Sequence, residues 1–225
     1  MDNANAASRP LKTPNHKLVE YNKLKDGMLT GDLLQWKKNT LLRWIYRKLI
    51  GSDADHSSLI IRLKQYEGDI DPNEGIIDPI RRYIMEETCS KGATLSRLSR
   101  RLDGYDGEVW LYRLKKDWTH KERKEIGRVL LEHVGTPYDT WAVVKNFFFN
   151  IWRRISTNTR FVWKVDDRKL FCSGYCYLAY TSVRRKLPVK EEPMMIFTGP
   201  PHPMDLPKFD IFEKPIKLYP SPNST

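Results

Sequence analysis

The order in which strand-like and helix-like segments follow one another constrains the fold of this chain more than any other feature of its sequence. Four short runs rich in apolar, β-branched or aromatic residues lie in the first half, at 28–36, 56–66, 81–88 and 108–114. Apart from one segment at 39–51, the helical patterns come later, at 119–135, 140–156 and 173–187. Strands that lie close in sequence and precede most helices favour an antiparallel sheet with helices packed against it. The sequence therefore predicts an α+β fold.

Capping signals give the expected limits of two of these helices. We expect the helix in 39–51 to be capped by Asn39 and to stop at Gly51, and the helix in 119–135 to be capped by Thr119 and to stop at Gly135. The second helix is expected to bury one apolar face, formed by Ile126, Val129, Leu130 and Val134.

The ordered part is expected to form one domain between two loose ends. Residues 1–17 are polar and contain Pro10 and Pro14, so they are interpreted as a flexible basic arm. Residues 18–218 are expected to form the domain, and 219–225 a loose tail.

Composition bounds the partners and the compartment. The formal net charge is +11, which favours anionic partners such as a membrane or polymer, although the scattered basic residues and the lack of a known nucleic-acid-binding signature do not favour nucleic acid. Three cysteines are too few for a disulfide framework. The N-terminus has no apolar signal-peptide region and no apolar run approaches 18 residues. We therefore expect a soluble, cytoplasmic protein.

The stretch "LFCSGYCYLAY", residues 170–180, contains two of the three cysteines and allows three interpretations. Cys172 stands near the expected start of a helix, where free backbone N–H groups and the helix dipole favour a thiolate. Cys172 and Cys176 lie one helical turn apart and could share a metal, although no further ligand has zinc-site spacing. Both cysteines could also be inert core residues.

A cysteine nucleophile needs a base, and His56 is the histidine placed best for that role. It begins a strand, whereas the other four lie in the arm, on a charged helix or in a proline-rich loop. Because side chains alternate along a strand, His56 and Ser58 are expected to share a face. Cys89, in "EETCSKG", is interpreted as a strand-end residue without a chemical role.

The segments "TGDLLQW", "DHSSLIIRL", "RRYIMEET", "EVWLYRL", "GTPYDTW" and "FCSGYCYLAY", in this order, resemble the circularly permuted papain-like amidases. These form the branch of the NlpC-type superfamily that contains the YiiX-like and YaeF-like cysteine hydrolases. The resemblance covers roughly residues 28–206. It implies a permuted papain-like fold in which an antiparallel sheet packs against helices and the cysteine helix follows the histidine strand.

The resemblance also implies roles for individual residues. Cys172 matches the nucleophile, His56 the base and Glu86 the orienting acid, with Glu87 as the alternative if the strand register differs by one residue. Tyr138 and Asp139 match a stretch of the family, and the residues expected at the substrate cleft are Ser58, Tyr138, Asp139 and Ser173. Tyr138 and Asp139 have an alternative, structural interpretation as the start of the next helix. No metal and no cofactor is expected.

The function expected from these residues is that of a cysteine amidase or peptidase acting through an acyl-enzyme on peptide-like amides, such as peptidoglycan peptides. The alternatives are a lipid-directed thiol esterase or acyltransferase of the same fold and a papain-like module that binds without turnover. The aromatic segment 141–155, flanked by Lys and Arg, is interpreted either as a core helix or as a surface that touches a membrane or an acyl chain.

Overall fold

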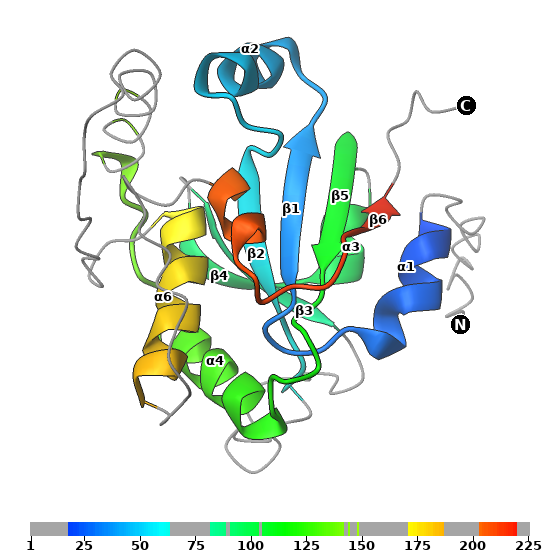
Figure 1. The fold of residues 1–225 in the computed structure, drawn as a ribbon. Coiled ribbons are helices and arrows are strands. Elements are labelled where there is room, and N and C mark those ends of the chain that lie inside the picture. The colour runs from blue at the N-terminus through cyan, green and yellow to red at the C-terminus, as the bar shows by residue number, and fades with distance from the viewer. Residues whose placement is uncertain are drawn as a thin grey trace, which may run out of the picture.

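The computed structural model describes residues 18–63, 82–88, 91–103, 105–141, 144, 148, 171–186 and 203–219. Its centre is a six-stranded antiparallel sheet with the strand order β4-β3-β2-β1-β5-β6 (Figure 1). The strands are β1 (Leu33–Lys38), β2 (His56–Ile61), β3 (Tyr83–Thr88), β4 (Gly92–Arg97), β5 (Gly107–Tyr112) and β6 (Ile216–Tyr219). The α+β class and the antiparallel sheet predicted from the sequence are confirmed.

Helices cover both faces of this sheet and one of its ends. They are α1 (Val19–Leu24), α2 (Leu41–Ile50), α3 (Leu98–Leu102), α4 (His120–Glu132) and α6 (Cys172–Lys186), together with the 3₁₀ turns η2 (Lys25–Gly27) and η4 (Pro203–Lys208). α4 and α6 pack against each other, while α2 lies beyond the end of β1, at the top of Figure 1. The N-terminal end of α6 is the one that points toward the end of the molecule where α2 lies (Figure 1).

The core is divided in two by the sheet because successive strand residues point to opposite faces. Leu59 and Ile61 of β2 pack in a cluster with α4 and α6, whereas Ile60 packs in a second cluster with α3. β2 is buried on both faces, which explains why its sequence contains a continuous apolar run.

A buried ion pair joins the sheet to the helical layer. The Asp32 carboxylate accepts hydrogen bonds from Arg123 of α4 at 2.9 Å and from the backbone N–H groups of Leu29 and Leu114. Arg123 also donates to the carbonyl oxygens of Thr30 and Leu114, so both charges are satisfied inside the protein.

The capping predictions are confirmed in part. Thr119 and Glu122 form a capping box at the start of α4, and Gly51 ends α2 in the left-handed conformation with φ of 69°. Asn39 is not the cap, because the residue at that position is Thr40. Val134 was placed wrongly on the buried face, since it follows the end of α4 and is exposed, whereas Ile126, Val129 and Leu130 are buried.

Some sequence predictions fall on residues that the structure does not describe. The arm 1–17 and Cys89 lie outside the described residues, as does most of the predicted helix 140–156. The predicted tail overlaps β6 by one residue, Tyr219, and its remainder also lies outside them. Within the described ranges, no helix is long and apolar enough to cross a membrane.

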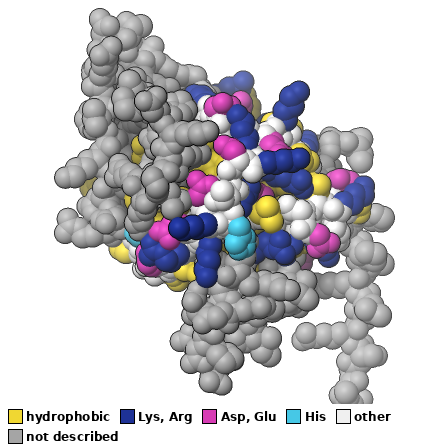
Figure 2. Space-filling view, turned by 60° about the horizontal axis from the view of Figure 1, so that its bottom comes forward, with side chains coloured by type: hydrophobic (Ala, Val, Ile, Leu, Met, Phe, Trp, Pro, Cys, Tyr) yellow, Lys and Arg dark blue, Asp and Glu magenta, His cyan; other side chains and the backbone are white. Residues whose placement is uncertain are grey.

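The basic residues do not form a single block on the face that Figure 2 brings forward. Lys and Arg side chains are spread there among Asp and Glu side chains. On α4, for example, Arg128 pairs with both Glu125 and Glu132. Exposed pairs of this kind contribute little to stability.

We expect Asp32→Ala to destabilise the protein by about 3–5 kcal/mol, because it leaves the buried Arg123 guanidinium without its counter-charge. Urea unfolding followed by circular dichroism measures this change. The matched control is Asp210→Ala, which removes an exposed partner of Lys115 and is expected to cost less than about 1 kcal/mol. Equal losses in both variants would contradict the role given to the buried pair.

Candidate active site

Three polar side chains meet where the start of β2 approaches the start of α6. His56 is the first residue of β2, Glu86 lies in β3, and Cys172 is the first residue of α6. These are the residues that the family resemblance matched to a base, an orienting acid and a nucleophile. The structure brings all three together.

Hydrogen bonds connect the three side chains in a row. The Nε2 atom of His56 lies 3.0 Å from Oε2 of Glu86, and the side chains of His56 and Glu86 are 17% and 4% exposed. The His56 ring also shares a hydrogen bond with the thiol of Cys172. Because Glu86 engages Nε2, the ring nitrogen left for the thiol is Nδ1. The carboxylate thereby fixes the orientation and the tautomer of the ring.

The Cys172 thiol lies beside β2 at the place where the pairing of β2 with β3 ends. That pairing covers Leu59 to Ile61, so the preceding residues of β2 lie outside it. The thiol is hydrogen-bonded by the backbone N–H of Ser57, from β2, and by that of Ser173, from the first turn of α6. Both donors stabilise the thiolate more than the neutral thiol.

The pKa values of Cys172 and His56 are shifted in opposite directions: that of the thiol is lowered and that of the imidazole is raised. Burial alone raises the pKa of the Cys172 thiol, but the hydrogen bond and charge of His56 and the two backbone N–H groups lower it below its usual value. Burial alone lowers the pKa of His56, but its hydrogen bonds to Cys172 and Glu86 and their negative charges raise it to about 10. Both shifts therefore favour a thiolate–imidazolium pair over the neutral thiol and imidazole.

Arg101 of α3 completes the row behind Glu86. Its Nε atom lies 3.1 Å and 3.3 Å from the two carboxylate oxygens of Glu86. Its guanidinium stacks over the rings of Trp36 and Tyr105, with distances of 5.0 and 5.6 Å to the ring centroids. Burial alone raises the pKa of Glu86, but His56 and then Arg101 lower it, so Glu86 stays ionised.

Sequence reasoning did not find Arg101. Arg101 lies in the basic segment "RRLDG", to which sequence analysis assigned no role. No local signal separates Arg101 from Arg100, its exposed neighbour on α3, because the contact with Glu86 forms only in the folded protein.

Tyr46 reaches the site from α2. Its phenol is half-buried, and its pKa is raised to about 12, first by burial and then by the negative charge of Cys172. The hydroxyl is therefore protonated at neutral pH and can donate a hydrogen bond. Sequence analysis placed Tyr46 in a helix but had no reason to assign it to the site.

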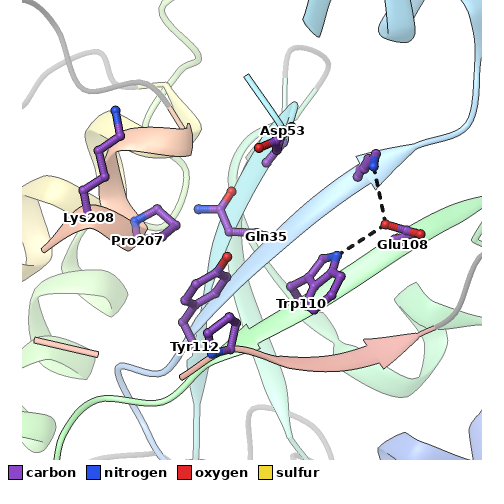
Figure 3. Close-up of a pocket in the computed structure, with 10 residues that line it drawn as sticks. Gln35, Asp53, Glu108, Trp110, Tyr112, Pro207 and Lys208 are labelled. Atoms are coloured by element: carbon purple, nitrogen blue, oxygen red, sulfur yellow. Dashed lines mark hydrogen bonds and ion pairs between the residues drawn. The ribbon is translucent and has the colours of Figure 1, made fainter. Parts of the chain in front are cut away.

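Gln35 of β1 links the site to a neighbouring pocket of about 480 Å³ (Figure 3). Its Nε2 atom donates to the Ser57 hydroxyl at 3.1 Å and to the carbonyl of Pro203 at 2.8 Å, so both amide hydrogens are used. Its Oε1 atom is buried and has no hydrogen-bond partner among the described residues. The other polar or aromatic side chains that line the pocket are Lys37, Asp53, Glu108, Trp110, Tyr112 and Lys208.

The residues matched to the substrate cleft occupy different environments. Ser58 is fully buried and accepts a hydrogen bond from the Trp36 indole at 2.8 Å, so it packs inside the domain and does not line a cleft. Ser173 is also buried, and its backbone N–H donates to Cys172. Tyr138 and Asp139 are half-buried in the loop after α4, where the Tyr138 carbonyl accepts from the N–H of Thr140.

Two choices left open by the sequence concern Glu87 and Cys176. Glu86 contacts His56, so the register that assigned Glu86 is the one observed. The side chain of Glu87 lies outside the described residues. Cys176 is fully buried in the cluster that joins α6 to α4, in agreement with its interpretation as a packing residue.

The described residues contain no group of three or more His, Cys, Asp or Glu side chains that could hold a metal ion.

Comparison with known proteins finds a similarity at the level of the fold. No known protein family matches the sequence, and no curated protein matches it. Among solved structures, the chain is similar to the metalloprotein yiiX from Escherichia coli O157:H7, described as DUF1105, with a TM-score of 0.55 and 12% sequence identity. The similarity covers 86% of this chain and 99% of that chain. It supports the association with YiiX-like folds, and at this identity it shows the fold alone.

We expect Cys172 to be alkylated by iodoacetamide faster than an ordinary thiol at pH 6, because its lowered pKa increases the thiolate fraction there. In His56→Ala the thiol loses its partner, and we expect labelling at pH 6 to slow by at least about tenfold, following the lost thiolate fraction. Peptide mass spectrometry over a range of pH gives the rate at each cysteine. Cys176, which is fully buried, is the internal control. A midpoint near pH 8.5 in both proteins would contradict the ion pair.

Arg101→Gln is expected to lower the pKa of His56, because the Glu86 carboxylate loses the cation that keeps it ionised and oriented. Histidine NMR titration of the folded protein measures this pKa directly, which a general loss of stability would not shift. Arg100→Gln is the matched control on the same helix, and Arg101→Lys is expected to restore part of the effect. An unchanged His56 pKa in Arg101→Gln would show that Arg101 does not position Glu86.

Proposed function

We propose that this protein is a cysteine hydrolase in which Cys172, His56 and Glu86 act as nucleophile, general base and orienting acid. The observation that carries the proposal is the hydrogen-bonded row from Glu86 through His56 to a thiol at the first residue of a helix. A buried thiol that packs inertly has a raised pKa, whereas the surroundings of Cys172 lower it.

We also propose that the fold is the circularly permuted papain-like arrangement. The proposal is supported by the chain order, in which the histidine strand β2 precedes the cysteine helix α6, and by the similarity to yiiX. That yiiX structure is described as a metalloprotein, whereas the described residues of this chain offer no three-ligand metal site.

The proposed reaction uses the ion pair at rest. The Cys172 thiolate attacks the carbonyl carbon of an amide or ester and forms a carbon–sulfur bond, while the carbonyl oxygen takes up the negative charge. The backbone N–H of Cys172, at the positive end of α6, is placed to hold this oxyanion. When the tetrahedral intermediate collapses, the carbon–nitrogen or carbon–oxygen bond breaks, and protonated His56 gives its proton to the leaving group.

The second half of the reaction returns the enzyme to its resting state. His56, now neutral, takes a proton from water, and the hydroxide attacks the thioester. The carbon–sulfur bond breaks, the acid is released, and the thiolate–imidazolium pair forms again. An alcohol or amine in place of water would give acyl transfer by the same steps. Tyr46, whose hydroxyl stays protonated, is a candidate second donor to the oxyanion.

Two substrate classes follow from the site. Peptide-like amides, such as those of peptidoglycan, are the first, as expected for YiiX-like and related amidases. Lipid acyl groups are the second, and this class is favoured by the large apolar side chains exposed on α2, the helix that carries Tyr46. In the third alternative the domain binds a ligand without turnover.

The test is to incubate the full chain with nitrophenyl esters of short and long fatty acids and with peptides of the peptidoglycan type. We expect release of product and a transient acyl adduct on Cys172, detected by intact-protein mass spectrometry. Cys172→Ala is expected to abolish both, whereas Cys176→Ala, a packing residue on the same helix, retains them. A correctly folded protein that forms no adduct with any of these compounds would favour the binding module.

A further inference from the structure

The helix α2 is attached to the domain by its polar side and presents its apolar side to solvent. Arg47, which is buried, donates to Asp55 at 2.7 Å and to the carbonyl of Lys38 at 2.8 Å. Tyr46, next to it, faces the candidate active site. Among the described side chains of the helix, the large apolar ones other than Tyr46 are exposed to solvent: Leu41, Leu42, Trp44, Ile45 and Leu49.

This arrangement is the reverse of that in an ordinary surface helix, where the apolar stripe packs on the core. Leu42 is 80% exposed and Leu41 is 71% exposed, in a helix of only ten residues. Single exposed leucines are common, but a contiguous apolar patch on a domain marks an interaction surface. The sheet ends below α2, so the patch lies at one end of the molecule (Figure 1).

The charges of α2 indicate the chemistry of the partner. The helix contains Arg43, Arg47 and Lys48 and no acidic residue, and Lys37 and Lys38 precede it by a few residues in the chain. The Lys48 ammonium lies 5.9 Å from the centroid of the Trp44 ring. Helices that lie in the headgroup region of anionic membranes have this composition: exposed Leu and Trp side chains with Arg and Lys beside them.

A second copy of the chain is a poorer partner for the same surface. A twofold interface places the same patch on both sides, so it would bring Arg43 and Lys48 of both molecules into one interface without adding any acidic residue of α2. The chain also carries a formal net charge of +11, which opposes self-association and favours an anionic surface.

We propose that α2 is a docking helix that inserts its exposed apolar side chains into the surface of an anionic lipid bilayer. Tyr46, on the same helix, lies close enough to Cys172 to be affected by its charge, so docking holds the Cys172 site near the lipid surface. The docking does not require turnover, so its test is independent of the proposed hydrolase activity.

The experiment is flotation of the full chain with vesicles that contain phosphatidylserine, compared with vesicles of phosphatidylcholine alone. We expect binding to the anionic vesicles that weakens as the salt concentration rises. The double variant Leu42→Gln/Trp44→Gln is expected to bind at least about tenfold more weakly, because it removes two inserted side chains. Arg43→Gln/Lys48→Gln is expected to reduce binding to the anionic vesicles only.

Controls separate this proposal from the alternatives. Cys172→Ala is expected to bind like the unaltered protein, so a failure of the hydrolase proposal leaves the binding result readable. Val134→Gln changes an exposed apolar residue just past α4 and is expected to have no effect. Trp141→Gln changes an exposed residue of the segment 141–155, which the sequence also suggested as a membrane surface.

Three results would overturn the proposal. The first is a folded chain that does not bind anionic vesicles. The second is binding that Trp141→Gln removes and Leu42→Gln/Trp44→Gln does not. The third is a dimer in light scattering that the α2 double variant dissociates, which would assign the patch to a second copy of the chain.

Discussion

The ion pair between Asp32 and Arg123 is the contact on which the position of the candidate nucleophile depends. It holds α4 against the loop that leads into β1, and Leu114, after β5, donates to the same carboxylate. α6 then packs on α4, where the Tyr175 hydroxyl donates to the carbonyl of Leu130. The Tyr180 hydroxyl donates to the carbonyl of Gly31 at 2.7 Å. Cys172 is thus fixed to β2 through contacts that begin at Asp32, far from the chemistry itself.

Local sequence patterns were sufficient to predict the elements that carry the three central side chains. His56 follows a polar stretch and begins a continuous apolar run, as expected for a strand buried on both faces. Cys172 precedes an apolar helical pattern, and Glu86 was assigned in the observed register. β4 and β6 were not predicted, because "GATLSR" lacks the β-branched density of the other strands and β6 is only four residues long.

The parts of the site that the sequence did not predict depend on contacts between distant segments. Arg101 is one of several arginines in a basic segment, and only the packing of α3 against Trp36 and Tyr105 places it on Glu86. The expected role of Ser58 was wrong for a similar reason. The group of β2 that reaches Cys172 is the backbone N–H of Ser57. It lies next to Cys172 at the point where the pairing of β2 with β3, which covers Leu59 to Ile61, has ended.

The four groups Arg101, Glu86, His56 and Cys172 alternate in charge when the thiol is ionised, and this alternation explains how a buried ion pair is tolerated. Moving charges out of water is costly, and the cost is offset only when each charge has a partner of opposite sign. The raised pKa of His56 favours the folded protein below the ordinary pKa of 6.5, and this contribution is lost as the pH rises through about 10. The lowered pKa of Cys172 acts in the opposite direction: its contribution is present above the ordinary value of 9.0 and is lost as the pH falls through the lowered pKa. Since each shift depends on the other charge, both groups are charged together only between these limits. Within that window the two shifts together favour the ionised thiol over the neutral one.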